Sequence, residues 1–239
     1  MNIMIRETQI QQVAYNVDNS LYELITYQPP FRIDLQAVKR KLLVYQETIF
    51  LKRVFDIVFS ALVIVAGLPV YALLALITKI TSPGPVFYRQ ERIGKDQKPF
   101  YIYKFRSMRV DAEQAGPQLA SDDDPRITKW GKFMRKTHLD ELPQFWNVLK
   151  GDMAIVGPRP ERRHFIDEIK ERKPEYMQLF RLKPGITSIG QVYYGYAENV
   201  NQMCERVNYD LDYLSTMSLK TDLDIILQTV KVMAQGKGK

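Results

Sequence analysis

The chain has 239 residues, enough for one or two domains with a hydrophobic core. Its single cysteine, Cys204, excludes an internal disulfide framework and a cysteine-rich zinc site. The net charge of +7 suits an anionic lipid surface, a phosphorylated substrate or nucleic acid, and charge alone does not choose among these partners.

Residues 1–33 form an N-terminal extension of unknown role, because they carry no motif and end near the boundary signal Pro29-Pro30. A helix is predicted to begin at Asp34, since apolar residues recur on one helical face: Leu35, Val38, Leu42, Tyr45 and Ile49. The pattern fits an interfacial amphipathic helix and an ordinary packing helix equally well.

The most apolar part of the chain follows, as 22 uncharged residues from Ile57 to Thr78. As one straight helix this run would be roughly 33 Å long, about enough to cross a hydrocarbon core of ~30 Å. Gly67, Leu68 and Pro69 lie at its middle. Because proline has no N–H and its ring clashes with the preceding turn, we predict that the helix bends there.

The charges that flank this run bear on its topology. Five basic residues precede it and five follow it: Lys39, Arg40, Lys41, Lys52 and Arg53, then Lys79, Arg89, Arg92, Lys95 and Lys98. Basic flanks favour the cytoplasmic side, so an even distribution gives no bias for carrying one flank across a membrane. Residues 34–81 are therefore predicted to form an interfacial helix and a re-entrant membrane helix, and a spanning helix with a tolerated proline fits these residues equally well.

Residues 82–239 are predicted to form a cytoplasmic lobe. Ser82-Pro83-Gly84-Pro85 is typical of a rigid turn, and two β-like runs after it, Val86–Tyr88 and Phe100–Tyr103, predict a hairpin. Residues 110–129 are polar and predict a loop. The three adjacent aspartates Asp122 to Asp124 indicate a solvated loop rather than a metal site, because successive side chains diverge.

Four helical segments are predicted beyond this loop: Leu139–Leu149, Glu161–Leu182, Gln202–Met217 and Thr221–Met233. The last has an apolar stripe that fits a core contact or a lipid contact. The predicted fold is thus an α-rich α/β membrane-associated (monotopic) protein, in which a re-entrant broken helix joins a lobe of amphipathic helices with a small β-hairpin.

Asp140 and Glu141 stand where the first of these segments begins. Thr137 suits an N-cap, acidic residues suit the positive end of the helix dipole, and Pro143 is tolerated in the first turn. By itself this arrangement is typical of an ordinary helix start.

Cationic residues on both sides give these carboxylates a chemical context. Arg135 precedes them, and Arg159 follows between Pro158 and Pro160, which fix its backbone and present its guanidinium as a fork for phosphate. Two carboxylates beside rigid arginines indicate a Mg²⁺ site next to a diphosphate clamp.

Ordered sequence blocks extend this pattern from about Lys52 to Met233: Lys52–Asp56 (KRVFD), Tyr103–Met108 (YKFRSM), Asp124–Thr128 (DPRIT), Asp140–Gln144 (DELPQ), Asn147–Met153 (NVLKGDM), Val156–Pro160 (VGPRP) and Lys183–Thr187 (KPGIT). In these blocks the chain resembles the small bacterial polyprenyl-phosphate sugar-1-phosphate transferases, the monotopic phosphoglycosyl transferases.

The resemblance implies an activity. Members of this family transfer sugar-1-phosphate from a nucleotide diphosphate-sugar, usually a UDP-sugar, to polyprenyl (undecaprenyl) phosphate and release UMP, with Mg²⁺ as the cofactor. By this resemblance we expect an enzyme at the cytoplasmic face of the bacterial inner membrane. It would initiate the lipid-linked assembly of an exopolysaccharide, capsule, O-antigen or glycoprotein glycan.

The resemblance also implies roles for individual residues. Asp140 corresponds to the nucleophile that takes up the phosphosugar covalently, and Asp140 and Glu141 correspond to the metal-binding pair. Four cations correspond to phosphate contacts: Arg135, Arg159, Lys104 and Arg106. The family's re-entrant helix break corresponds to Gly67, Leu68 and Pro69, which favours the re-entrant topology. Here Leu68 replaces a serine of some relatives, whose hydroxyl can bond the carbonyl that proline frees.

A non-catalytic membrane-associated protein that binds anionic lipid or nucleic acid is the alternative function. It would account for the charge and the apolar run, but not for the carboxylates beside Arg135 and Arg159. No zinc-finger or RNP-type motif is present, so no nucleic-acid partner is expected. His138 and His164 lack ligand spacing and indicate packing or surface roles. No motif indicates the transferred sugar or the oligomeric state.

Overall fold

The computed structural model describes residues 35–235 apart from 115, 117, 122 and 123, with side chains from Leu43 onward. The predicted extension 1–33 lies outside the described residues. By its internal contacts the chain divides after Val54, so the unit Phe55–Lys239 is described by itself below. The predicted boundaries after residues 33 and 81 stay predictions.

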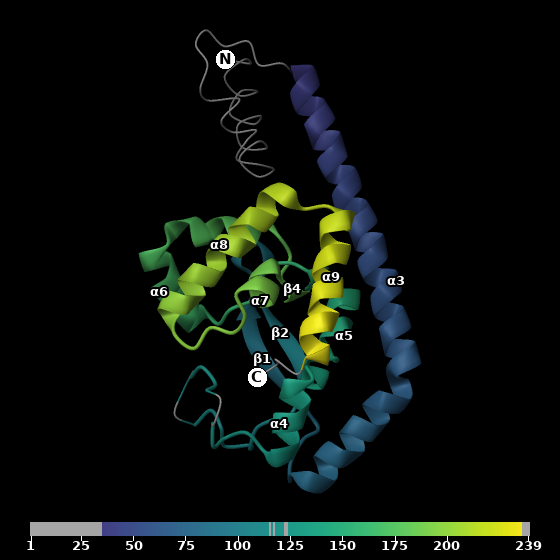
Figure 1. Ribbon diagram of the computed structural model, residues 1–239, viewed down its shortest axis with the longest axis vertical. Helices are drawn as coiled ribbons and strands as arrows, with labels where there is room; N and C mark the ends of the chain where they lie inside the picture. The colour runs from purple at the N-terminus through teal and green to yellow at the C-terminus, as the bar shows by residue number, and fades with distance from the viewer. Residues whose placement is uncertain (1–34, 115, 117, 122–123, 236–239) are drawn as a thin grey trace. The chain divides into compact units, whose positions relative to one another are not determined.

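One long helix, α3 (Leu35–Thr81), replaces the interfacial helix and broken membrane helix expected from the sequence. Pro69 lies inside it, and the helix axis changes direction in the second half (Figure 1). The bend that Pro69 predicts is therefore present, and the backbone stays helical through Gly67, Leu68 and Pro69. One proline removes a single hydrogen bond and displaces only the turn before it, which a helix of 47 residues can absorb.

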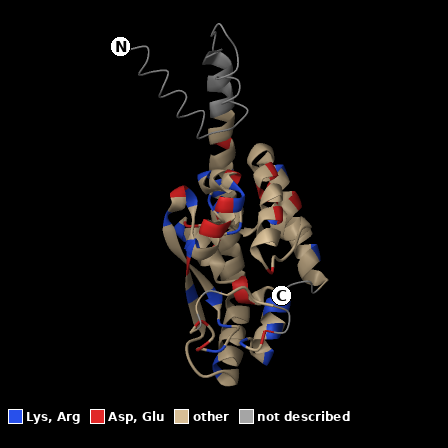
Figure 2. Ribbon diagram, turned by 90° about the vertical axis from the view of Figure 1, so that its left-hand side faces the viewer, with Lys and Arg blue, Asp and Glu red and all other residues tan. Residues whose placement is uncertain are grey.

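The part of α3 from Leu43 to Thr81 is long and apolar enough to cross a membrane, by length and composition. Its apolar side chains are largely exposed, among them Val58, Leu62, Val65, Leu73 and Ile80. Charged residues of both signs are instead spread over the rest of the Phe55–Lys239 unit (Figure 2).

Both halves of the bent helix contact the lobe. Near its middle, the Asp56 carboxylate accepts a hydrogen bond from the backbone N–H of Ile155 (3.1 Å). Beyond Pro69, the Tyr71 hydroxyl donates to the carbonyl of Leu142 (2.7 Å), and Thr78 accepts from the Trp130 indole (3.1 Å). The apolar run is therefore attached to the lobe on both sides of Pro69.

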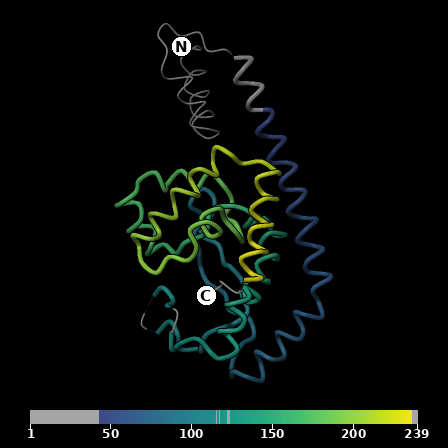
Figure 3. Tube along the Cα trace, viewed as in Figure 1, coloured from purple at the N-terminus to yellow at the C-terminus, as the bar shows by residue number. Residues whose placement is uncertain are grey.

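The predicted hairpin is confirmed, with longer strands than expected. Strands β1 (Phe87–Ile93) and β2 (Pro99–Phe105) are antiparallel, with Phe87 opposite Phe105. The turn η1 (Lys95–Gln97) joins them. In Figure 3 the hairpin lies between the segment that carries α4 and the segment that carries α8.

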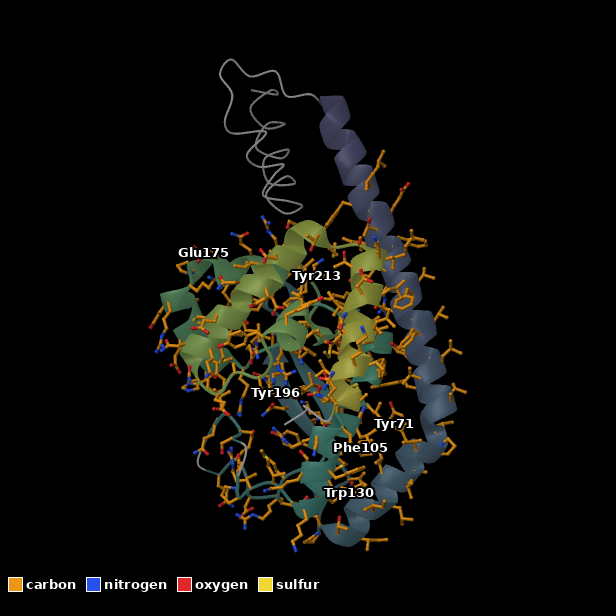
Figure 4. All side chains as sticks on the ribbon, viewed as in Figure 1. Tyr71, Phe105, Trp130, Glu175, Tyr196 and Tyr213 are labelled. Atoms are coloured by element: carbon orange, nitrogen blue, oxygen red, sulfur yellow. The ribbon has the colours of Figure 1, made fainter. Side chains whose placement is uncertain are left out.

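This hairpin contributes to three hydrophobic clusters of the described residues. Ile93 packs with α6 (Arg163–Arg172), η3 (Pro174–Arg181) and α8 (Val200–Thr216). Ile102 packs with α5 (Gln144–Lys150), β3 (Ala154–Val156) and α9 (Leu219–Ala234). Phe105 packs with Met134 of α4 (Lys129–Lys136) and Leu74 of α3, and the labelled Tyr71, Phe105 and Trp130 in Figure 4 mark this region. The hairpin thus joins the elements around it into one lobe.

A second sheet was not predicted from the sequence. Strand β3 pairs in parallel with β4 (Gly185–Thr187), which leads into α7 (Ile189–Tyr193). Three-residue strands are too short to show a period of two. Their backbones also approach closely, since a Cβ on Gly185 would lie 2.2 Å from the nitrogen of Gly157.

The predicted helices beyond the loop are partly confirmed. Helices α8 and α9 lie where Gln202–Met217 and Thr221–Met233 were predicted, and α9 buries Ile225 but exposes Leu227. The predicted helix Glu161–Leu182 is split into α6 and η3, because the chain turns at Lys173-Pro174 and the residue before a proline disfavours helical geometry. Helix α4 was not predicted.

The predicted loop 110–129 contains no helix or strand in its described part up to Thr128. Of its three aspartates, Asp124 accepts hydrogen bonds from the Arg126 side chain, and the other two lie outside the described residues. Asp124 is therefore a partner of an arginine.

Asn147 offers a test of how the hairpin is held. Its side chain is fully buried, accepts from the backbone N–H of Tyr103 (3.1 Å) and donates to the carbonyl of Tyr101 (2.7 Å). Asn147→Ala should lower the free energy of unfolding by about 2–3 kcal/mol, because two buried backbone groups lose their partners. Urea denaturation in detergent measures this. Asn201→Ala on the exposed face of α8 is the control, and an equal effect of both variants would contradict the role of Asn147.

Candidate active site

Asp140 and Glu141 lie in a tight 3₁₀ turn, η2 (Leu139–Glu141), between α4 and α5. The predicted helix start at this point is wrong. Thr137 ends α4 instead of capping a new helix, since its hydroxyl donates to the carbonyls of Phe133 (2.9 Å) and Met134 (3.1 Å). His138 then adopts a left-handed conformation with φ of 56°, which reverses the chain. A role as helix caps therefore does not account for the two carboxylates.

Both carboxylates are almost completely buried, with exposed fractions of 4% for Asp140 and 6% for Glu141. Burial of adjacent carboxylates is unfavourable unless cations compensate their charge. Lys104 Nζ of β2 donates to Glu141 Oε1 at 2.5 Å, and Arg159 Nη2 lies 3.6 Å from the same oxygen. The structure thus brings Lys104 and Arg159, both predicted from the sequence, to the Asp140–Glu141 pair.

The pKa values of the two carboxyl groups move in opposite directions. Burial raises the pKa of Asp140 above its usual range. Burial alone would also raise the pKa of Glu141, but the charges of Lys104 and Arg159 hold it well below its usual range. Two adjacent carboxylates with separated pKa values are typical of sites at which they have different roles.

Asp140 differs from Glu141 in its partners. Within the described part of the chain, no hydrogen bond or ion pair joins its carboxylate to another residue, and it lines a cavity of about 260 Å³. Arg135 of α4 lines the same cavity, and its buried Nε has no hydrogen-bond partner. The Asp140 carboxyl group and the Arg135 side chain, whose Nε is unsatisfied, therefore line the same space.

The segment around Arg159 is held rigidly, as the flanking prolines predicted. The carbonyl of Pro158 accepts from the backbone N–H of Gly185 (2.9 Å), and the carbonyl of Pro160 accepts from Arg92 (3.1 Å). The Arg159 guanidinium also lies over the ring of Tyr196, 5.9 Å from its centre. These contacts hold the guanidinium beside Glu141.

Arg106 is placed differently from the other predicted cations. It lines the cavity, but its guanidinium donates to the carbonyls of Ser82 (2.6 Å) and Pro83 (2.8 Å). These bonds fix the turn after α3. The assignment of Arg106 to phosphate binding stays a prediction. In the structure its guanidinium stabilises the turn at Ser82 and Pro83.

Sequence reasoning missed several polar residues of the cavity. Tyr196 comes from the segment between α7 and α8 and stacks on His138, with ring centres 6.1 Å apart. Glu161 accepts from both Arg92 of β1 and Arg206 of α8. Only Glu161 had a local signal, because it directly follows Pro-Arg-Pro. The others reach the site from distant parts of the chain.

The donor set fits Mg²⁺ in the form predicted. No group of three or more potential ligands occurs among the described residues, so a cage made only of protein is absent there. Mg²⁺ is usually bound by one or two carboxylates, with substrate phosphates and water as the other ligands. The unpartnered Asp140 beside Glu141 fits that arrangement.

The Lys104–Glu141 contact can be tested through stability. Lys104→Met should lower the free energy of unfolding by about 3 kcal/mol, because the buried Glu141 loses its nearest cation. Lys150→Met is the control, since Lys150 pairs with Asp152 but its side chain is 44% exposed. That surface pair should contribute less than about 1 kcal/mol. Equal losses in urea denaturation would show that Lys104 does not compensate a buried charge.

Comparison with known proteins assigns the chain to a family. The family described as "Bacterial sugar transferase" matches residues 47–236. The UDP-N-acetylgalactosamine-undecaprenyl-phosphate N-acetylgalactosaminephosphotransferase of Aeromonas hydrophila is 42% identical over 189 residues, which are 79% of this chain and 45% of the relative. The UDP-glucose:undecaprenyl-phosphate glucose-1-phosphate transferase of Escherichia coli (strain K12) is 43% identical over 182 residues, 75% of this chain and 39% of the relative.

A relative from Caulobacter vibrioides, also named UDP-glucose:undecaprenyl-phosphate glucose-1-phosphate transferase, is 42% identical over 75% of this chain and 68% of its own length. The matched part covers less than half of the first two relatives. Since the family match extends over most of the sequence, the chain belongs to the bacterial sugar transferase family.

Proposed function

We propose that this protein transfers sugar-1-phosphate from a UDP-sugar to undecaprenyl phosphate and releases UMP. The observation that carries the proposal is the unpartnered Asp140 carboxylate, which faces a cavity beside Glu141, Lys104, Arg135 and Arg159. The names of the relatives specify the same class of donor and acceptor for those proteins.

The cations of the cavity suit the charges of both substrates. A nucleotide diphosphate-sugar and a lipid phosphate bring several negative charges together, and phosphoryl transfer depends mainly on positioning and charge stabilisation. The guanidinium groups of Arg135 and Arg159 are suited to bind phosphate oxygens as forks. Bound by Asp140, Glu141 and the diphosphate, Mg²⁺ would supply further neutralisation of this charge.

The free carboxylate supports a covalent two-step reaction. In the first step an oxygen of Asp140 attacks the phosphorus that carries the sugar. The bond from this phosphorus to the UMP oxygen breaks, and UMP leaves with the electron pair. In the second step a phosphate oxygen of the lipid attacks the same phosphorus and releases Asp140. The two bulky substrates then need not be bound at the same time.

Glu141 has a different part in this proposal. Lys104 and Arg159 hold it ionised at 2.5 Å and 3.6 Å. An ionised Glu141 can contribute a metal ligand while it keeps Lys104 and Arg159 beside the reacting phosphorus. Asp140 is left free to react.

We place the reaction at the cytoplasmic face of the bacterial inner membrane, where it would initiate the assembly of a lipid-linked glycan. The acceptor is a lipid, so the carboxylates must lie at the level of the headgroups. Contacts at both ends of the apolar run support a re-entrant α3, because Asp56 and Thr78 both bond to the same lobe. A spanning helix would separate its ends by about 30 Å on opposite sides of the membrane.

The nucleophile can be tested by Asp140→Asn. This variant should lose UMP release by several orders of magnitude, because an amide is a poor nucleophile and metal ligand. The assay uses detergent-solubilised protein, UDP-sugars and undecaprenyl phosphate. Wild-type protein given a UDP-sugar without lipid should also gain the mass of a phosphosugar, which Asp140→Asn should not.

Asp167→Asn on the exposed face of α6 is the matched control and should keep full activity. A folded Asp140→Asn protein with near-normal UMP release would end the covalent mechanism. Failure of the wild-type protein to release UMP from any UDP-sugar would end the proposed function as a whole.

The topology can be tested with single cysteines at positions 41 and 95 in a Cys204→Ser background. If α3 is re-entrant, an impermeant thiol reagent should label both positions from the cytoplasmic side. Pro69→Leu restores the missing hydrogen bond and should move part of the population toward a spanning state. Labelling of the two positions from opposite sides in the background protein would refute the re-entrant topology.

A further inference from the structure

The cavity that Asp140 lines has a second wall of six polar side chains that the proposed mechanism does not use. They come from β1, the loop after β2, the segment after β3, and α8: Gln90, Arg92, Glu113, Glu161, Arg162 and Arg206. We call this set the polar wall. Its members are up to 116 positions apart in the sequence, between Gln90 and Arg206.

Half of the polar wall is centred on Glu113. Arg162 Nη1 and Gln90 Nε2 both donate to Glu113 Oε1, at 2.9 Å and 2.7 Å. The oxygen of the Gln90 amide accepts in turn from Arg92 Nη2 at 2.6 Å. The strand β1 and the loop after β2 are thereby joined across the cavity wall.

The other half is centred on Glu161. Arg206 Nη2 donates to Glu161 Oε1 at 2.5 Å, and Arg92 Nη1 lies 3.4 Å from Glu161 Oε2. The side chains of Arg206 and Glu161 are each only 6% exposed. Both carboxylates of the polar wall are therefore compensated by arginines of the wall itself.

We call Lys104, Arg135 and Arg159 the cationic end of the cavity. The polar wall and the cationic end suit different chemical groups of a ligand. A phosphate oxygen only accepts hydrogen bonds, which suits Lys104, Arg135 and Arg159. A hydroxyl both donates and accepts. The polar wall presents both functions, since its guanidinium groups donate and the oxygens of Glu113, Glu161 and Gln90 accept. It suits an uncharged group with several hydroxyls.

Size and position indicate which part of the donor this is. A cavity of about 260 Å³ lies below the range of roughly 300–1,000 Å³ for drug-sized ligands, so it encloses only part of a nucleotide-sugar. Arg92 and Glu161 line the same cavity as Asp140 and Glu141, which places the wall beside the carboxylates. The sugar is bonded to the attacked phosphorus, whereas the nucleoside lies beyond a second phosphate.

We propose that the polar wall binds the hydroxyls of the transferred sugar and determines which UDP-sugar the protein uses. This inference rests on the proposed function, because it assumes a UDP-sugar donor with its phosphates at the cationic end. Glu113 and Arg162 are then specificity residues, with no part in the covalent step.

Binding of UDP-sugars and of UDP to the detergent-solubilised full chain tests this separately from turnover. The probe is whichever of UDP-glucose, UDP-galactose, UDP-N-acetylglucosamine and UDP-N-acetylgalactosamine binds most tightly by titration calorimetry. Glu113→Gln keeps the size of the side chain but not its charge, and Arg162→Lys keeps the charge but not the fork. Each should weaken binding of that UDP-sugar about tenfold, because hydrogen bonds to charged groups are lost. Binding of UDP, which lacks the transferred sugar, should change less than about twofold.

Glu168→Gln is the matched control, because its side chain is 38% exposed, close to the 40% of Glu113, but lies on α6 beside His164. It should change neither affinity.

If thermal melting shows that either Glu113→Gln or Arg162→Lys does not fold, the binding data of the other variant test the inference. Equal losses for UDP and UDP-sugar would assign the wall to the nucleotide or its phosphates and overturn the inference. Unchanged binding of both, or equal binding of UDP and every UDP-sugar by the wild type, would also overturn it. Absence of UMP release by the wild type, together with a sugar-specific loss in the variants, would overturn the proposed function alone.

Discussion

The structure depends on the burial of two adjacent carboxylates. Removal of a carboxylate from water costs several kcal/mol even after relaxation, so Asp140 and Glu141 are stable in the interior only while cations surround them. Lys104 comes from β2, Arg135 from α4 and Arg159 from the segment after β3. The site therefore forms only when these three parts of the chain pack together, which couples its electrostatics to the fold.

The hairpin provides the rigidity for this assembly. Between Ile102 and Phe105, which are buried in two different hydrophobic clusters, β2 carries Lys104 to Glu141. The Asn147 side chain accepts a hydrogen bond from the backbone N–H of Tyr103, the residue before Lys104 in the same strand. Small movements of this strand would change a charge pair at 2.5 Å, so the packing of the hairpin and the electrostatics of the site are one constraint.

The bend of α3 brings a second constraint, since the acceptor we propose is a lipid. Asp56 and Tyr71 attach the helix to the lobe on either side of Pro69, and Tyr71 bonds the residue that follows Glu141. The anchor and the carboxylates are thus linked by a single hydrogen bond, which would fix the depth of the site relative to the headgroups. The polar wall would then act on the part of the donor that faces away from the cationic end.

The sequence by itself determined the elements with local signals: the long apolar helix, the hairpin, α8, α9, and the pairing of Asp140 and Glu141 with rigid arginines. Each rests on periodicity, proline or near neighbours in the chain. Only the tertiary structure decided that α3 bends without interruption, that Asp140 and Glu141 lie in a 3₁₀ turn, and that Arg106 bonds a turn. Tyr196, Arg92 and Arg206 could not be predicted as site residues, because their proximity arises from packing between segments far apart in the chain. Hydrophobic patterns specify which faces are buried, but they do not specify which polar groups meet across them.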